Sequence, residues 1–253
     1  MLTRPLAAVS TKAYFGVGRT REWVAAVARL APLSAELDVE LAVLPTFPLL
    51  ESTAAALEGT GIGWGAQDVA ATEDGAQTGE VLASVLADLG CRYVEVGHAE
   101  RRSRFGESGA VVRAKAGAVV RAGMVPLVCV GEPDRMSPDA AAAFSIDQVL
   151  EAMADVPDAE VVVGYEPVWA IGAEEPAPVD HVVSVATQLR DALTRRATAV
   201  RILYGGTAGP GLATRLGDAV DGLFLGRRAH DVGALEAVMH ELSAARHADR
   251  PRG

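Results

Sequence analysis

The chain has 253 residues, of which 50% are hydrophobic and 5% are aromatic, and its formal net charge is −10 at pH 7. This length fits one large domain or two small ones, and the excess of acidic residues argues against nucleic acid or an anionic membrane surface as a partner. An anionic substrate would have to be held by local N–H groups and single basic side chains, because the overall field repels it.

The sequence also predicts a location and a redox state. Residues 1–6 lack the apolar core of a signal peptide, and no stretch reaches the roughly 18 apolar residues of a membrane span. Cys91 and Cys129 each lie at or inside an apolar strand-like run, which favours two buried thiols over a disulfide. We therefore expect a soluble, cytoplasmic protein.

Short apolar runs alternate along the chain with segments of helical period. In chain order, strands are expected at residues 6–9, 41–44, 61–66, 93–96, 125–130, 161–163, 200–204 and 222–225. Helices are expected after these strands, among them one capped by Thr20, one capped by Thr78 with Glu80 in its first turn, one at 108–121, one opening at Pro138, one after Pro178 and a last one ending near Ala245.

Eight strand-then-helix units without a linker or a change of composition indicate a single α/β domain. Consecutive strands joined by helices form a parallel sheet, and eight of them at this length favour a closed (β/α)8 barrel over an open sheet. The predicted barrel covers residues 1–245, and residues 246–253 are expected to form a polar, frayed tail. Catalytic groups of such barrels lie at the C-terminal ends of the strands, where this chain has Lys12, His98, Glu166, Thr207 and Gly226.

The stretch from Val163 to Gly172 is the most informative part of the sequence. Glu166 ends an apolar β-branched run, and Pro167 directly after it prevents the strand from continuing. A carboxyl group held among apolar neighbours is a candidate for proton transfer, because desolvation raises its pKa towards the working range. On this local pattern alone, a strand-end carboxylate that faces water is an equally good interpretation.

Four segments of the chain resemble motifs of the triose-phosphate isomerase family. They are Gly164–Gly172, Glu95–Arg102, Cys129–Glu132 and Tyr204–Thr207, and the resemblance extends in order from Leu6 to Leu242. The resemblance implies a TIM barrel, an aldose–ketose isomerase of a small phosphorylated sugar, and a homodimer that acts in glycolysis and gluconeogenesis. It implies no cofactor, and we find no nicotinamide, flavin, pyridoxal or metal signature in the sequence.

The same resemblance implies a role for individual residues. Glu166 would move a proton between adjacent carbons, neutral His98 would donate an N–H to the enediolate oxygens, and Lys12 would add positive charge beside them. Backbone N–H groups of Gly172, Thr207, Gly226 and Arg227 would hold the phosphate. Glu100 would support the lysine, and Thr78 would reach the active site of the partner subunit.

Two departures from the family pattern lie where substrate would bind. Ser10 stands where the family has Asn, which leaves space, and Arg227 replaces a Gly of the phosphate loop. The sequence therefore leaves two substrates open. Glyceraldehyde 3-phosphate and dihydroxyacetone phosphate come first, and a four-carbon ketose phosphate such as erythrulose phosphate comes second. A non-catalytic phosphate-binding relative is a third, weaker alternative.

Overall fold

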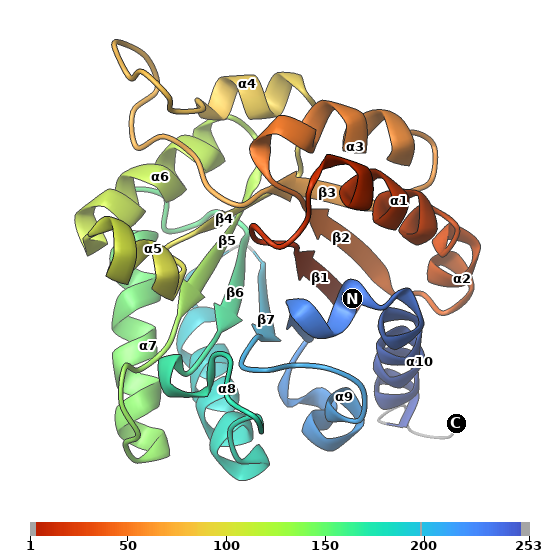
Figure 1. The fold of residues 1–253 in the computed structure, drawn as a ribbon. Coiled ribbons are helices and arrows are strands. Elements are labelled where there is room, and N and C mark those ends of the chain that lie inside the picture. The colour runs from red at the N-terminus through yellow and green to blue at the C-terminus, as the bar shows by residue number, and fades with distance from the viewer. Residues whose placement is uncertain (1–3, 198, 249–253) are drawn as a thin grey trace.

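The computed structural model describes residues 4–197 and 199–248, with side chains up to residue 246. In it, eight parallel strands close into a barrel (Figure 1). The strands are β1 (Leu6–Ser10), β2 (Glu40–Leu44), β3 (Gly63–Ala66), β4 (Tyr93–Val96), β5 (Val125–Val130), β6 (Val161–Tyr165), β7 (Val200–Tyr204) and β8 (Gly222–Leu225). Each strand pairs with the next, and β8 returns to pair with β1. The predicted single (β/α)8 barrel is confirmed.

Helices surround the barrel on all sides (Figure 1). They are α1 (Val17–Ala28), α2 (Ala31–Glu36), α3 (Leu50–Leu57), α4 (Ala83–Asp88), α5 (Ala99–Phe105), α6 (Gly109–Arg121), α7 (Pro138–Ala152), α8 (Val179–Leu193), α9 (Leu212–Leu216) and α10 (Val232–Ala248). Short 3-10 helices lie at Phe47–Leu49 (η1), Val168–Ala170 (η2), Gly217–Ala219 (η3) and Arg227–His230 (η4). Ser108 and Ser137 cap α6 and α7 through their side chains, as residues of this type do at helix starts.

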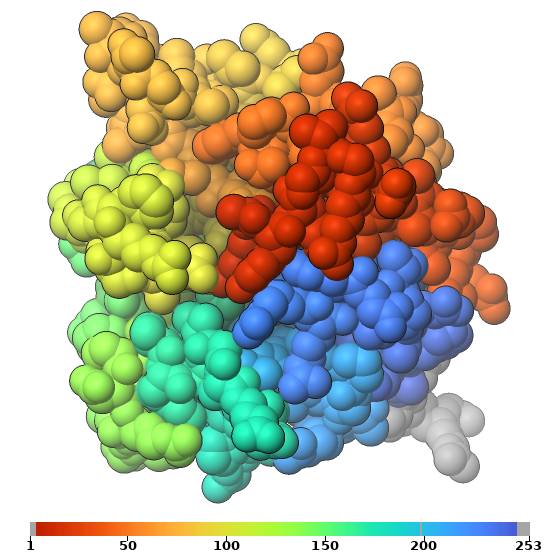
Figure 2. Space-filling view, viewed as in Figure 1, coloured from red at the N-terminus to blue at the C-terminus, as the bar shows by residue number. Residues whose placement is uncertain are grey.

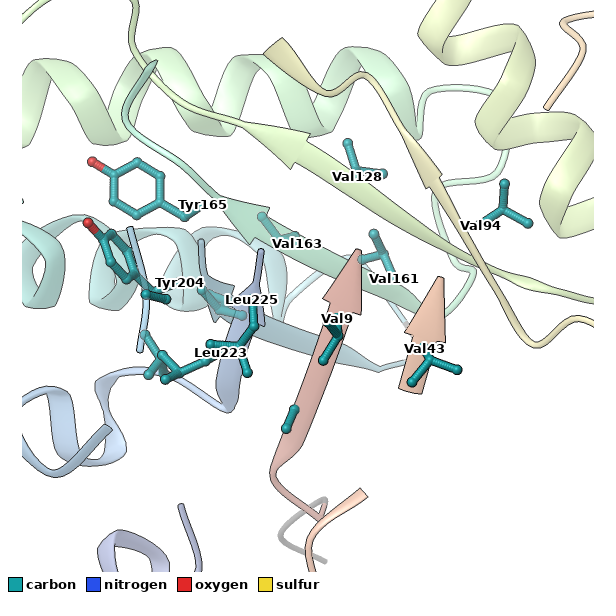
Figure 3. Close-up of a cluster of buried hydrophobic side chains, with 14 of the residues drawn as sticks. Val9, Val43, Val94, Val128, Val161, Val163, Tyr165, Tyr204, Leu223 and Leu225 are labelled. Atoms are coloured by element: carbon teal, nitrogen blue, oxygen red, sulfur yellow. The ribbon is translucent and has the colours of Figure 1, made fainter. Parts of the chain in front are cut away.

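The alternation of side chains along each strand divides the core into two parts. One set of residues packs between the barrel and its helices and includes Val9, Val94, Val128, Val163 and Leu223 (Figure 3). The alternate set fills the barrel interior and consists of Leu6, Ala8, Ala42, Leu44, Tyr93, Leu127, Cys129, Val162, Leu203 and Phe224. A polar residue in register with this second set must therefore point into the barrel.

Two expected helix caps are wrong. Thr20 lies inside α1, which begins at Val17, and its Oγ1 donates to the carbonyl of Gly16 at 3.0 Å. Thr78 does not begin α4, because Gly75 and Gly79 take positive φ angles of 98° and 93° and turn the chain before the helix can start. The segment 71–82 instead projects from the barrel (Figure 1).

Several other expectations can be compared with the described residues. Cys91 and Cys129 are both buried and free, as predicted. α10 continues to Ala248, and residues 249–253 of the expected tail lie outside the described residues. Among the helices described, none has the length and apolarity to cross a membrane.

Candidate active site

The C-terminal ends of the strands surround a cavity of about 640 Å³. Its mouth lies at the centre of the face in Figure 2, where the red N-terminal, blue-green middle and blue C-terminal segments meet. Most of the predicted site residues line it, namely Ser10, Lys12, Glu100, Glu166, Gly172, Thr207, Gly226 and Arg227. His98 lies behind this lining and is 2% exposed, whereas Thr78 is exposed on the projecting segment and is not part of the cavity.

Lys12, His98 and Glu166 converge although they are far apart in the sequence. Lys12 Nζ lies 3.2 Å from His98 Nε2, and His98 Nε2 lies 3.3 Å from Glu166 Oε2. Each residue follows the C-terminal end of a different strand, β1, β4 or β6, so the barrel closure itself brings them together. An ammonium, an imidazole and a carboxylate therefore share one edge of the cavity.

The backbone fixes the tautomer of His98. Its Nδ1 accepts the backbone N–H of Glu100 at 3.0 Å, because His98 is the N-cap of α5. A nitrogen that accepts carries no proton, so the ring is neutral and its single N–H is on Nε2. This N–H points towards the side of the site where Glu166 and Lys12 lie.

Glu166 occupies a space that a neighbouring glycine leaves free. A Cβ atom on Gly205 would lie 2.5 Å from Cγ and from Oε1 of Glu166, so only glycine fits at that position. Glu166 is 6% exposed, and its Oε2 has no hydrogen-bond partner among the described residues. A buried carboxylate oxygen without a partner has a lone pair free to accept a proton from a ligand.

Lys12 is held in place by charge and by an uncommon backbone conformation. Burial disfavours its charged form, but Glu166, Glu100 and Glu95 outweigh burial and raise the pKa of Lys12 above its ordinary value of 10.5. Its Nζ donates to Glu100 Oε1 at 2.9 Å. Lys12 and Thr207 are two of the non-glycine residues with positive φ, at 45° and 53°, and both line the cavity. Such backbone strain is typical of functional sites.

Another part of the cavity wall has the features of an anion site. Gly172, Thr207, Gly226 and Arg227 come from the segments that follow β6, β7 and β8. The Arg227 guanidinium lies 5.7 Å from the centre of the Tyr14 ring, and a Cβ on Gly172 would lie 3.9 Å from its Nη2. Arg227 thus reaches across the mouth towards the segment that carries Gly172.

That segment, residues 166–177, is tied to its surroundings by hydrogen bonds. Trp169 Nε1 donates to Glu132 Oε1 at 2.9 Å, the N–H of Ala177 donates to the Tyr204 hydroxyl at 2.9 Å, and the Thr207 hydroxyl donates to the carbonyl of Ala170 at 2.8 Å. These contacts link the segment to the residues after β5, to β7 and to the loop after β7.

The sequence prediction missed Glu95. It lies on β4, two residues after inward-pointing Tyr93, so its side chain enters the barrel interior, where it is 4% exposed. Burial raises the pKa of the Glu95 carboxyl to about 7, against the lowering effect of His98, Lys12 and Ser10. The sequence shows a Glu two residues after Tyr93 in an apolar strand. Only the structure shows that this set of alternate residues points into the barrel.

The raised pKa of Glu95 predicts a pH-dependent effect on stability. Because the folded protein holds this proton more tightly than the unfolded chain, the stabilisation is complete below about pH 4.5 and is lost as the pH rises through about 7. We expect Glu95→Gln to match the wild type near pH 4.5 but to be more stable at pH 8, by on the order of 3 kcal/mol. Urea unfolding of both proteins at the two pH values tests this, and an equal difference at both would contradict it.

A buried ionic cluster supports the helix that His98 caps. Arg101 of α5 contacts Asp68 at 2.8 Å and Glu107 at 2.7 Å, and Lys115 of α6 contacts the same two carboxylates at 2.6 and 2.5 Å. These contacts indicate a structural role for Arg101. Lys115 was missed, because a buried lysine on a helix is recognised only through partners that are distant in sequence.

Among the described residues, no group of three or more potential metal ligands is found.

Comparison with known proteins gives consistent matches. A family model described as triosephosphate isomerase matches residues 5–242. An L-erythrulose-1-phosphate isomerase of Pectobacterium atrosepticum is 43% identical over 247 residues, which cover 92% of this chain and 93% of that protein. Triosephosphate isomerases of Thermus thermophilus and Bordetella pertussis are 41% and 45% identical, covering 83% and 75% of this chain and 86% and 78% of their own lengths.

Proposed function

This chain belongs to the triosephosphate isomerase family, and we propose that it isomerises a small phosphorylated sugar by proton transfer through an enediolate. The observation that carries the proposal is the convergence of Lys12, His98 and Glu166 beside one cavity, with contacts of 3.2 and 3.3 Å. The relatives named above are isomerases, so the reaction class agrees with the family.

Glu166 is the proposed base. Its unpartnered Oε2 takes a proton from the carbon beside the substrate carbonyl, and the electron pair of that C–H bond forms the enediolate. The protonated carboxyl then returns a proton to the former carbonyl carbon, while the hydroxyl proton of the neighbouring carbon passes to the former carbonyl oxygen, which leaves the new carbonyl on the neighbour. Burial of Glu166 supports this role, because few water molecules have to be displaced before the carboxylate meets the substrate carbon.

His98 and Lys12 stabilise the negative charge of the enediolate in this proposal. The Nε2–H of neutral His98 donates to the two oxygens in turn, and the Lys12 ammonium adds a positive charge at the same edge. The hydrogen bond from Lys12 to Glu100 holds the ammonium in position. Because these groups are fixed before substrate arrives, little reorganisation is needed during the reaction.

The phosphate is proposed to bind at the anion site of the cavity wall. Backbone N–H groups of Gly172, Thr207, Gly226 and Arg227 supply donors there, and the Arg227 side chain adds a positive charge. The segment 166–177 would close over the phosphate, which keeps water away from the enediolate.

Of the two substrates that the sequence leaves open, we favour the four-carbon ketose phosphate. The relative named for L-erythrulose 1-phosphate aligns with 92% of this chain, and the two triosephosphate isomerases described above align with 83% and 75%. Ser10, which is smaller than the Asn of the family pattern, also leaves space at the cavity wall. This order reverses the preference that the sequence alone suggested.

One comparison tests both parts of the proposal. We expect kcat/KM for an erythrulose phosphate to exceed that for glyceraldehyde 3-phosphate by about 100-fold, measured on one preparation. Glu166→Gln, prepared in the same host, controls for contaminating host isomerase. A preference of similar size for glyceraldehyde 3-phosphate would restore the triose assignment. Binding of 2-phosphoglycolate without exchange of carbon-bound protons would indicate a non-catalytic relative.

We also propose that the chain forms a homodimer through the projecting segment 71–82. Thr78 on this segment is exposed and far from the cavity of its own subunit, which is consistent with a residue that reaches a neighbouring subunit. Sedimentation of the intact chain and of a Thr78→Arg variant tests this proposal. A wild type that sediments as a monomer would contradict it.

A further inference from the structure

A smaller side cavity of about 350 Å³ lies between the C-terminal ends of β4 and β5 and the helices α5 and α7. It adjoins the first cavity, because the two share the lining residues Ala99, Ser103, Glu166 and Val168. The residues that line only the side cavity take no part in the proton transfer or the phosphate binding proposed above. Apart from a few polar groups its wall is apolar, as is usual for cavities that bind small molecules.

Arg102 brings a positive charge into the side cavity. It lies on α5 and is half-buried, and its Nε donates to the carbonyl of Gly97 at 2.8 Å. A Cβ atom on Gly97 would lie 3.0 Å from Nη2, so the guanidinium packs against the end of β4. Within the described part of the chain, no carboxylate forms an ion pair with Arg102 and neither Nη has a hydrogen-bond acceptor. Burial lowers the pKa of Arg102, and Glu151 and Glu107 offset this only in part.

Gln148 of α7 contributes uncharged donors to the same cavity. Its Oε1 accepts the backbone N–H of Gly131 at 2.9 Å, so the two amide protons are on the other atom, Nε2. Among the described residues, these protons have no acceptor. The one carboxylate of the described wall, Glu166, lies at the border with the first cavity, where its Oε2 is 3.3 Å from His98 Nε2. Donors from two helices thus enter one cavity without a protein acceptor, which points to a ligand that supplies one.

The charge of the side cavity favours a carboxylate over a phosphate. Arg102 offsets one negative charge, whereas a phosphate monoester carries about 1.5 to 2 at pH 7, and Glu166 on the wall repels the excess. A planar carboxylate also matches the fork of a guanidinium with two parallel hydrogen bonds. Val130, Pro133 and Phe144 belong to the apolar part of the wall, and Phe144 is 39% exposed. They suit a hydrocarbon or aromatic body attached to the carboxylate.

We infer that the side cavity binds a small monocarboxylate with an apolar body, held by Arg102 and Gln148, and that this ligand slows turnover without occupying the first cavity. Glu166 and Val168 line both cavities, and Val168 begins the 3-10 helix of the segment 166–177. A body packed against Val168 restrains this segment. The effect on turnover rests on the proposed function, because it assumes that Glu166 is the base and that the segment closes. The binding site itself does not depend on that assumption.

The first test compares a carboxylate with its uncharged amide, using 3-phenylpropanoate and 3-phenylpropanamide. By calorimetric titration of the intact chain, we expect the acid to bind at least about tenfold tighter, as hydrogen bonds to a charged group would give. Arg102→Met should reduce this ratio to about one by weakening the acid alone, and Gln148→Leu should weaken the acid about threefold. Arg102→Lys, which keeps the charge without the fork, replaces Arg102→Met if the latter does not fold, and should lower the ratio at least about threefold.

Arg104→Met is the matched control, because Arg104 lies on the same helix but lines only the first cavity. It should leave the ratio unchanged. Saturating 2-phosphoglycolate, which fills the first cavity, should weaken the acid by less than about tenfold and then reach a plateau, as coupling between two separate sites requires. In steady-state kinetics, saturating acid should lower kcat at least about threefold in the wild type and leave kcat of Arg102→Met unchanged.

Equal binding of acid and amide, or an acid preference that survives Arg102→Met, would overturn the inference. Weakening by 2-phosphoglycolate that grows without a plateau would place the acid in the first cavity and would also overturn it. Tighter binding of 2-phenylethyl phosphate than of the acid would refute the choice of a monocarboxylate, and an unchanged kcat would refute the effect on turnover. The expected binding ratios without turnover of either sugar phosphate would instead refute the proposed isomerase activity and leave the carboxylate site in place.

Discussion

Glu166→Asp is expected to lower kcat by about 100-fold while KM changes little, because the carboxylate retreats by one methylene from the carbon that it must deprotonate. The phosphate and the hydroxyl groups of the substrate are bound by other residues, so binding should be retained. Steady-state kinetics on the better of the two candidate substrates measures both constants. An unchanged kcat would remove Glu166 from its role as the base.

Glu160→Asp is the matched control, since it makes the same change at the other end of β6. Glu160 is partly exposed and contacts Arg201 at 3.4 Å, at the end of the barrel away from the cavity. A general effect of shortening a carboxylate next to this strand would lower kcat in both variants. Solvent exchange of the substrate carbon-bound proton, measured by NMR, should slow in Glu166→Asp alone.

The sequence predicted the barrel well because its strands are apolar, short and regularly separated. β4, β5, β7 and β8 have the predicted bounds, and closure follows from their number and parallel direction. The errors concern helix starts. Thr20 and Thr78 are residue types that cap helices, but positive φ at Gly79 and a helix start at Val17 depend on contacts that a local pattern does not contain.

The convergence of the three residues proposed for proton transfer was predictable for a different reason. Lys12, His98 and Glu166 follow directly after recognisable strands, so a barrel places all of them at one mouth. Glu95 lies within a strand, where an isolated carboxylate can face either the helices or the interior. Only the observed register, with Tyr93 inside and Val94 outside, decides between these directions.

The position of His98 could be predicted, but its tautomer could not. The sequence allowed a neutral ring that donates one N–H, without indicating which nitrogen carries the proton. The backbone N–H of Glu100, donated to Nδ1 at 3.0 Å, answers this question because α5 begins at the next residue. The chemistry of the site thus depends on a helix start that the sequence prediction did not include.

Lys12→Met is expected to lower kcat/KM by about 1000-fold, because it removes the cation that both the enediolate and the nearby carboxylates require. The variant leaves Glu100 and Glu166 without the ammonium that Lys12 supplies, so binding of an anionic substrate should weaken together with kcat. Since the pKa of wild-type Lys12 is raised, its charge and the stability that it contributes persist up to about pH 10.5 and are lost only above it. No decline of kcat/KM caused by Lys12 is therefore expected between pH 6 and 9.

Arg21→Met provides the control for a lost positive charge, because Arg21 is exposed on α1 and does not line the cavity. If the negative net charge of the whole chain governed substrate entry, both variants would lose activity to a similar degree, and the loss would shrink at high ionic strength. We expect a large, salt-resistant loss in Lys12→Met alone. Adding Glu100→Gln to Lys12→Met should recover part of the lost affinity for 2-phosphoglycolate, since it removes a carboxylate that repels the ligand. No recovery would mean that Lys12 acts only on the enediolate.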